Sequence, residues 1–331
     1  MERLQKVARR CVTVPAVLGS ATALALTLPL WLPALAVVDL FRRKRFASLR
    51  TGILLLLFLL YESVGVLAAG WLWLRHRLGG SDEATFLEEN FRPQCWWVQA
   101  HAANVKRIFG LRIDVDVKPG FGRGPLIVLM RHASIADTML GVLLFSAPYG
   151  LRLRYVLKRE LLYDPCLDIV GNRLPNVFVS RDGQDATGGI GAVARLAEAL
   201  GPNDGVLIYP EGTRFTPEKR RRILARLREQ GDEADLARAE KLEHLLPPRP
   251  GGTLALLESA HEIDVALVAH VGFEGVAQLS DLWSGRIIDA RVQVRGWRFP
   301  AGAIPADRSE WLREAWEGLD AWIAKHGDAR T

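Results

Sequence analysis

The first 75 residues contain two long apolar stretches. Residues 12–38 include no charged side chain, and residues 51–61 and 63–74 are uncharged on either side of Glu62. A helix needs about 20 mainly apolar residues to cross the hydrocarbon core of a bilayer, and both stretches reach that length. The pattern predicts an N-terminal membrane anchor of two apolar helices within residues 1–78. A buried hairpin of a soluble protein is the alternative.

Basic residues flank both stretches on every side, and Arg42-Arg43-Lys44-Arg45 lies between them. Lys and Arg concentrate on the cytoplasmic side of membrane proteins, so two full spans would place this loop on the disfavoured side. A hairpin that enters a single leaflet would keep all basic flanks on the cytoplasmic face. Both topologies stay open, and we expect a membrane location with the functional site facing the cytoplasm.

From residue 79 onward, short apolar runs alternate with amphipathic stretches. The pattern predicts strands over residues 111–117, 125–130, 154–157, 176–179, 206–209, 265–271 and 292–294. It predicts helices over residues 86–109, 138–145, 190–200, 254–260 and 309–325. Strands that alternate with helices indicate an α/β fold with a mixed, mostly parallel sheet flanked by helices, here expected over residues 79–331.

A His-x4-Asp segment follows the apolar run of residues 125–130, with His132 and Asp137 at its ends. Residues at the junction of a strand and a helix often bind ligands in α/β folds. A turn could bring the Asp137 carboxylate to the His132 imidazole, which would then accept a proton near neutral pH. The substrate would supply the attacking hydroxyl. The alternative is a structural histidine bonded to an aspartate that caps a helix.

A second turn, Tyr209-Pro210-Glu211-Gly212-Thr213-Arg214, follows the apolar run of residues 206–209. Glycine permits a close backbone approach, and neighbouring N–H groups can face an anion. Arg214 offers a planar fork to phosphate oxygens. Glu211 is expected either to pair with Arg214 or to bind an acceptor hydroxyl. An ordinary turn with a surface arginine is the alternative.

Together these motifs resemble the 1-acylglycerol-3-phosphate acyltransferase family, the glycerolipid acyltransferases. The resemblance rests on His132 with Asp137, on residues 210–214 and their separation from the first motif, on residues 177–181 ending in Arg181, and on residues 158–161 beginning with Lys158. It covers roughly residues 90–275. Residues 211–252 further resemble the subgroup of lysocardiolipin and lysophosphatidate acyltransferases.

The resemblance implies a membrane-bound O-acyltransferase of phospholipid biosynthesis. Acyl-CoA or acyl carrier protein would donate the acyl group as co-substrate, without another cofactor. The acceptor would be a lysophospholipid, with 1-acylglycerol-3-phosphate giving phosphatidate as the expected reaction. It further implies the site roles, with His132 and Asp137 catalytic and the following residues binding the acceptor: Lys158, Arg181, Glu211, Gly212, Thr213 and Arg214.

Two positions depart from the family pattern. Arg131 precedes the histidine where the family usually has Asn, and residues 265–270 lack the usual proline. Another lysophospholipid acceptor and a catalytically inactive lipid-binding protein are therefore kept as alternatives. A hydrolase is disfavoured because no Gly-x-Ser-x-Gly motif is present.

The composition adds little to this picture. The chain has 43 Lys and Arg against 37 Asp and Glu, a net charge of +6. The basic residues of 219–228 form either a solvated helix face or a helix on anionic lipid, and no nucleic-acid-binding module accompanies them. The three cysteines have no metal-site spacing, so no metal is expected. His244, His261 and His270 are interpreted as structural or surface residues.

Overall fold

The computed structural model describes residues 2–179, 186–276 and 278–327. The chain divides into two compact units. The first comprises Met1–Leu111, Leu157–Asp182 and Ser280–Asp289, and the second comprises Arg112–Val156, Gly183–Leu279 and Ala290–Thr331. The boundary expected between an anchor over residues 1–78 and an acyltransferase domain over residues 79–331 stays a prediction.

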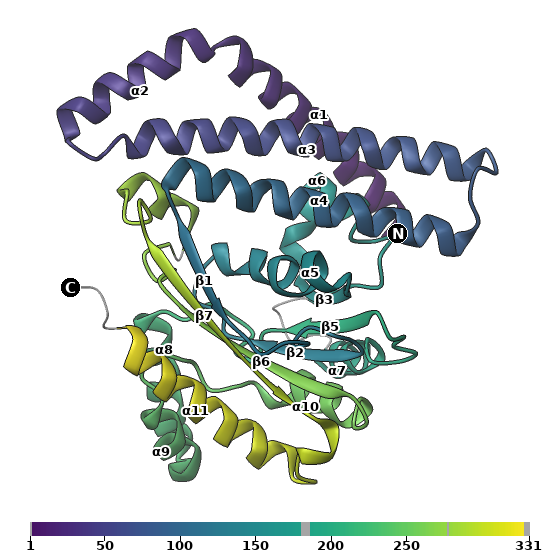
Figure 1. The fold of residues 1–331 in the computed structure, drawn as a ribbon, viewed down its shortest axis with the longest axis vertical. Helices are drawn as coiled ribbons and strands as arrows, with labels where there is room; N and C mark the ends of the chain where they lie inside the picture. The colour runs from purple at the N-terminus through teal and green to yellow at the C-terminus, as the bar shows by residue number, and fades with distance from the viewer. Residues whose placement is uncertain (1, 180–185, 277, 328–331) are drawn as a thin grey trace. The chain divides into compact units, whose positions relative to one another are not determined.

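Long helices dominate the first unit (Figure 1). They are α1 (Glu2–Leu26), α2 (Leu28–Arg42), α3 (Ala47–Arg77) and α4 (Glu83–Phe109). Short elements complete this unit: η3 (Arg159–Tyr163), α6 (Pro165–Ile169), β4 (Val177–Val179) and η4 (Leu279–Ser284). Helix α4 starts at Asp82, whose carboxylate accepts the N–H of Thr85 at 2.7 Å, and it ends at Gly110 in a left-handed conformation.

The first apolar stretch does not form one straight helix. Helices α1 and α2 meet at Thr27 with a bend of 71°, and Pro29, which lacks an N–H, lies in the first turn of α2. Within the described residues, α3 is long and apolar enough to cross a membrane, and the bent pair passes the same test when it is counted as one span.

Two buried carboxylates of the first unit are paired within it. The carboxylate of Asp39 accepts the N–H groups of Ser48 and Leu49, which lie in the first turn of α3. Arg9 and Arg10 form ion pairs with the wholly buried Asp168 at 2.6 and 2.9 Å. Two basic residues in front of the first apolar stretch therefore contact a protein carboxylate.

The strands form a seven-stranded sheet with the order β1-β7-β6-β2-β5-β3-β4. All described pairings are parallel except that between β6 and β7. The strands of the second unit are β1 (Arg112–Asp116), β2 (Leu126–Met130), β3 (Arg152–Lys158), β5 (Asp204–Ile208), β6 (Asp264–Val271) and β7 (Arg291–Phe299). Every residue of β2 and β5 is buried, which explains the apolar sequence of β2 and of residues 206–208 in β5.

The helices of the second unit are α5 (Ala147–Tyr149), α7 (Ala186–Arg195), α8 (Pro217–Gln230), α9 (Glu233–Lys241), α10 (Pro250–Ser259) and α11 (Arg308–Gly327). Helix α10 packs against α7, and α11 packs against α10 and β6 (Figure 1). The prediction of an α/β fold with a mixed, mostly parallel sheet flanked by helices is confirmed.

Two predicted helices were wrong in detail. Residues 138–145 are helical as predicted, but they include a 3-10 helix η1 (Ala136–Met139) and a π-helix η2 (Val142–Ser146) on either side of two α-helical residues. The tight turn that returns Asp137 toward His132 starts this segment, so regular α-helical spacing does not apply there. Helix α7 ends at Arg195 rather than near residue 200, and Ala199 beyond it has a left-handed backbone. Helix α9 was not predicted.

Candidate active site

Three adjacent parallel strands end at the candidate site. Strand β2 lies between β5 and β6 and is parallel to both, so the carboxyl ends of all three lie at one edge of the sheet. His132 follows β2 by two residues, Glu211 follows β5 by three, and His270 is the last residue but one of β6. Ligands of α/β proteins commonly bind at this edge.

The imidazole of His132 is hydrogen-bonded to the carboxylate of Asp137. Nδ1 of His132 lies 2.9 Å from Oδ1 of Asp137, and the His132 side chain is 12% exposed. An ionised carboxylate can only accept, so Nδ1 carries the hydrogen and Nε2 is left with a lone pair. The ring stacks on Tyr209 with centroids 4.3 Å apart, which holds its plane. The arrangement presents a proton acceptor of fixed orientation.

The turn from His132 to Asp137 is closed by hydrogen bonds between the Asp137 side chain and backbone N–H groups of the same turn. Oδ2 of Asp137 accepts the N–H groups of Ala133 and Ser134, each at 2.7 Å. Asp137 is completely buried. Burial works to raise the pKa of Asp137, but its hydrogen bonds with His132 and His270 outweigh burial and hold that pKa below its usual range. The carboxylate therefore stays ionised and can stabilise a protonated imidazole.

Glu211 connects the second motif to the first. Its Oε1 accepts the backbone N–H of His132 at 2.8 Å, and its Oε2 accepts that of Leu246 at 2.9 Å. Burial raises the pKa of Glu211 to about 8, although both backbone hydrogen bonds work in the opposite direction. The sequence suggested a pairing with Arg214 or with an acceptor hydroxyl. The structure instead directs both oxygens to backbone donors, because the turns after β2 and β5 lie side by side.

The turn after β5 places a further arginine against Gly212. Gly212 has a φ of +64°, and its N–H donates to the carbonyl of Tyr209 at 2.9 Å. A Cβ at Gly212 would lie 2.9 Å from Cδ of Arg249, and the N–H of Arg249 donates to the carbonyl of Pro210 at 2.8 Å. Arg249 thus lies directly on the motif although it is 37 positions away in the sequence. Its significance was missed because only the fold brings it there.

Thr213 and Arg214 continue the turn into α8. Nζ of Lys219 donates to Oγ1 of Thr213 at 2.9 Å and to the carbonyl of Arg214 at 2.8 Å. The N–H of Phe215 donates to the carbonyl of His132 at 2.7 Å. Lys219 is part of the basic run of residues 219–228, so this part of the run holds the turn in place.

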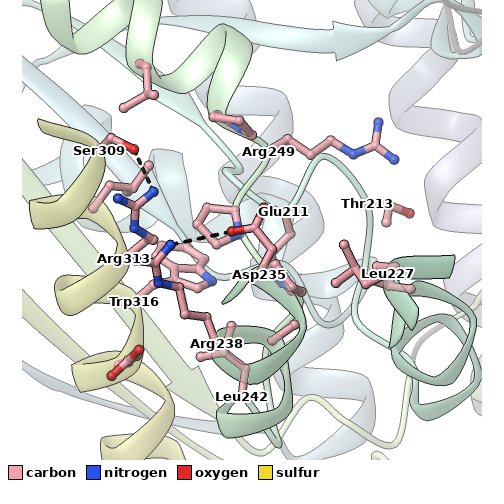
Figure 2. Close-up of a pocket in the computed structure, with 18 of the residues that line it drawn as sticks. Glu211, Thr213, Leu227, Asp235, Arg238, Leu242, Arg249, Ser309, Arg313 and Trp316 are labelled. Atoms are coloured by element: carbon pink, nitrogen blue, oxygen red, sulfur yellow. Dashed lines mark hydrogen bonds and ion pairs between the residues drawn. The ribbon is translucent and has the colours of Figure 1, made fainter. Parts of the chain in front are cut away.

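A cavity of about 270 Å³ borders the same turn (Figure 2). Its wall includes Glu211, Thr213 and Arg249, with side chains of α8, α9 and α11 opposite. Figure 2 shows the guanidinium of Arg249 extending away from Arg313. Arg313 forms an ion pair with Glu310 and donates a hydrogen bond to Ser309. The structure gives the side chain of Arg249 no such partner within the described residues, so it is available to an anion.

Arg131 and His270 are the other residues whose position the sequence did not reveal. Arg131 is 1% exposed and donates to the carbonyl of His270 and, at 2.8 Å, to Oε1 of Glu274. His270 was interpreted as structural, yet its Nε2 lies 3.4 Å from Oδ2 of Asp137. A histidine in an otherwise apolar strand that ends beside β2 is the signal that could have identified it.

The structure does not test the expected roles of two site residues. Lys158 is the last residue of β3 and belongs to the first unit, and Arg181 lies outside the described residues. Their roles stay predictions. Within residues 2–179, 186–276 and 278–327, no group of three His, Cys, Asp or Glu side chains is placed to hold a metal ion.

Comparisons with known proteins find similar sequences and a similar fold. Residues 102–253 match the family model named Acyltransferase. The chain is 30% identical over 176 residues to lyso-ornithine lipid O-acyltransferase from Pseudomonas aeruginosa, a match that covers 53% of this chain and 61% of that protein. The chain therefore spans less than two thirds of this relative.

The fold is similar to a solved structure. The 1-acyl-sn-glycerophosphate (LPA) acyltransferase PlsC from Thermotoga maritima superposes with a TM-score of 0.56 at 15% sequence identity. The match covers 86% of this chain and 99% of that one. At this level of identity the likeness establishes a common fold.

Proposed function

We propose that this chain, whose residues 102–253 match the family model named Acyltransferase, transfers a fatty acyl group from a thioester donor to the hydroxyl of a lysophospholipid. The donor is acyl-CoA or an acyl carrier protein. The acceptor is 1-acylglycerol-3-phosphate, and the product is phosphatidate. The observation that carries this proposal is the hydrogen bond of His132 to the buried carboxylate of Asp137, at an edge where three parallel strands end.

The reaction needs a base and no enzyme nucleophile. Nε2 of His132 takes the proton of the acceptor hydroxyl, and the hydroxyl oxygen bonds to the carbonyl carbon of the thioester. The tetrahedral intermediate then expels the thiolate as the C–S bond breaks. The imidazolium returns its proton to the leaving thiolate. Asp137 stabilises the imidazolium between these steps.

The cationic groups of the second motif are proposed to bind the acceptor's phosphate. Arginine guanidinium groups form paired hydrogen bonds with phosphate oxygens. Arg214 follows Gly212 in the turn, and Arg249 lies against Gly212. Lys158 and Arg181 join them by family resemblance. Glu211 supports this site indirectly, because it links the turn to the backbone of His132.

We place the chain at a membrane, with the site facing the cytoplasm. Helix α3 is long and apolar enough to span a bilayer, and the bent pair α1–α2 fits either a broken span or a re-entrant hairpin. An acceptor with a fatty chain partitions into the bilayer, so a membrane anchor would bring the enzyme to its substrate.

A panel assay of the purified full-length chain tests the proposal. The acceptors are 1-acylglycerol-3-phosphate, other lysophospholipids and lyso-ornithine lipid. The donors are labelled acyl-CoA and acyl carrier protein, and products are identified by mass spectrometry. His132→Ala should abolish transfer, whereas His261→Ala, at a histidine with a 64% exposed side chain, should leave it unchanged. Transfer at the normal rate by a folded His132→Ala protein would exclude the proposed base.

Lyso-ornithine lipid is the second candidate acceptor, favoured by the 30% identity to an enzyme named for it. Transfer to that lipid without transfer to 1-acylglycerol-3-phosphate would replace the first candidate. Lysolipid binding without turnover for any donor would favour the inactive lipid-binding alternative that Arg131 suggested.

A further inference from the structure

A second imidazole lies behind the Asp137 carboxylate. His270 is completely buried, and its Nε2 lies 3.4 Å from Oδ2 of Asp137 and 3.3 Å from the carbonyl oxygen of Arg131. Both neighbours of this nitrogen are acceptors, so Nε2 carries a hydrogen. The carboxylate is thus placed between two histidines, with His132 on Oδ1 and His270 on Oδ2.

The geometry indicates that His270 is neutral. Its Nδ1 is buried and has no hydrogen-bond partner within the described residues. Protonation would place a charged N–H there without an acceptor, which is costly inside a protein. Arg131 holds the strand end in place by donating to the carbonyl of His270 and to Glu274. Around the shared carboxylate, the charged and titratable neighbours are Arg131, His132, Tyr209, Glu211 and Glu274.

We propose that His270 is a positioning residue that lowers the basicity of His132 by sharing the carboxylate of Asp137. This inference rests on the proposed function, because it describes the same base. Oδ2 already accepts two backbone N–H groups, and the Nε2–H of His270, which is hydrogen-bonded to the Arg131 carbonyl at 3.3 Å, lies 3.4 Å from the same oxygen. Each donor withdraws negative charge from the carboxylate, so the carboxylate stabilises the His132 imidazolium less. His132 is thereby kept unprotonated, and ready to accept a proton, at a lower pH.

Two variants of His270 separate this role from simple packing. His270→Leu removes the donor and keeps an apolar side chain that can fill the space beside Phe273, whose ring centroid lies 5.5 Å away. His270→Gln can place an amide N–H where Nε2 lies. Loss of one neutral hydrogen bond corresponds to about half to one pH unit. We expect the acid limb of the kcat/KM profile to move to higher pH by that amount in His270→Leu and to stay in place in His270→Gln.

A direct titration keeps this test independent of the acceptor. NMR spectra of histidine-labelled protein in detergent micelles report the pKa of His132, with His132→Gln used to assign its signals. The pKa should rise in His270→Leu and return toward the original value in His270→Gln. An unchanged His132 pKa in folded His270→Leu protein would overturn the inference, as would equal shifts in both variants. A failed acyl-transfer assay with the expected NMR shifts would reject the proposed function and leave the positioning role standing.

Discussion

The turns after β2 and β5 both leave fully buried strands, yet they are closed in different ways. The turn after β2 closes on itself, because Asp137 accepts the N–H groups of Ala133 and Ser134. The turn after β5 has an internal hydrogen bond from Gly212 to Tyr209, but its carboxyl group binds remote segments, since Glu211 accepts the N–H groups of His132 and Leu246. A turn closed by its own backbone holds one catalytic pair in a fixed geometry. A turn whose carboxyl group binds remote segments gathers binding groups from several parts of the chain.

The two turns also differ in the ionisation of their buried carboxyl groups. Asp137 interacts with two imidazoles and two backbone N–H groups, and its pKa is lowered. Glu211 has two backbone donors, and burial raises its pKa to about 8. Equal burial thus has opposite consequences, because the number and kind of hydrogen-bond donors decide which form of the acid is favoured. Five predictions test the comparison between the two turns.

Asp137→Asn should have the largest effect. The amide cannot hold His132 in the required tautomer and also accept the two backbone N–H groups, so we expect kcat to fall by about 10²–10⁴-fold. The KM for the acceptor should change little. Asp114→Asn, at an exposed position of β1, is the control. A raised KM with a normal kcat in steady-state kinetics would indicate that Asp137 contributes to acceptor binding and not to the chemical step.

Arg249→Ala should affect binding rather than chemistry. Loss of a charged hydrogen bond to phosphate corresponds to about a 10–100-fold decrease in kcat/KM, carried mainly by the acceptor KM. Arg226→Ala removes a guanidinium from the wall of the same cavity. Within the described residues Arg226 forms no hydrogen bond or ion pair with the turn, so this variant should leave the kinetics unchanged. Equal effects of both variants would indicate a general electrostatic role for the cavity.

Glu211→Gln should change the pH dependence of stability. The folded-state pKa of about 8 lies above the ordinary value of 4.5, so the free energy of unfolding from this group falls by about 1.4 kcal/mol per pH unit between these values. Gln leaves one backbone N–H without an acceptor, which costs about 1–3 kcal/mol, but it does not titrate. The variant should be less stable than the parent at pH 5, and because the parent loses about 4 kcal/mol between pH 5 and 8, the difference should shrink and change sign toward pH 8. Denaturant unfolding in detergent at both pH values measures this difference in the free energy of unfolding. An equal difference between variant and parent at both pH values would contradict a raised pKa of Glu211.

Asp137 should have the opposite pH dependence. Its lowered folded-state pKa means that its stabilisation is present above pH 4 and is lost as the pH falls further. The same unfolding experiments, extended to pH 3, should therefore show a loss of stability on the acid side that Asp137→Asn diminishes.

Gly212→Ala should have the smallest effect and needs a matched control. Gly212 and Gly231 both have a left-handed backbone, with φ of +64° and +71°, so alanine at either site costs about 1 kcal/mol in the free energy of unfolding. Only at Gly212 would the new Cβ meet Arg249, whereas at Gly231 it meets nothing within 4 Å. A raised acceptor KM in Gly212→Ala and not in Gly231→Ala would locate the acceptor at the Arg249 contact. Equal acceptor KM values in the two variants would indicate that Arg249 does not bind the acceptor.

Local sequence patterns sufficed for the features that depend on neighbouring residues. The wholly apolar runs predicted β2 and β5, and helix α4 matches the predicted helix because Asp82 and Gly110 cap its two ends. The 3-10 and π-helical turns after Asp137 were not predictable in this way. Their geometry follows from hydrogen bonds of the turn that periodicity does not encode.

The contact between His132 and Asp137 is a local property of the chain, since their spacing allows it within one turn. The groups that surround this pair are set by the fold. Glu211 reaches the His132 N–H across 79 positions, and Arg131 reaches the His270 carbonyl across 139. The physical reason is strand order: β2 lies between β5 and β6, and this adjacency comes from packing of buried strands whose apolar sequences do not specify their neighbours.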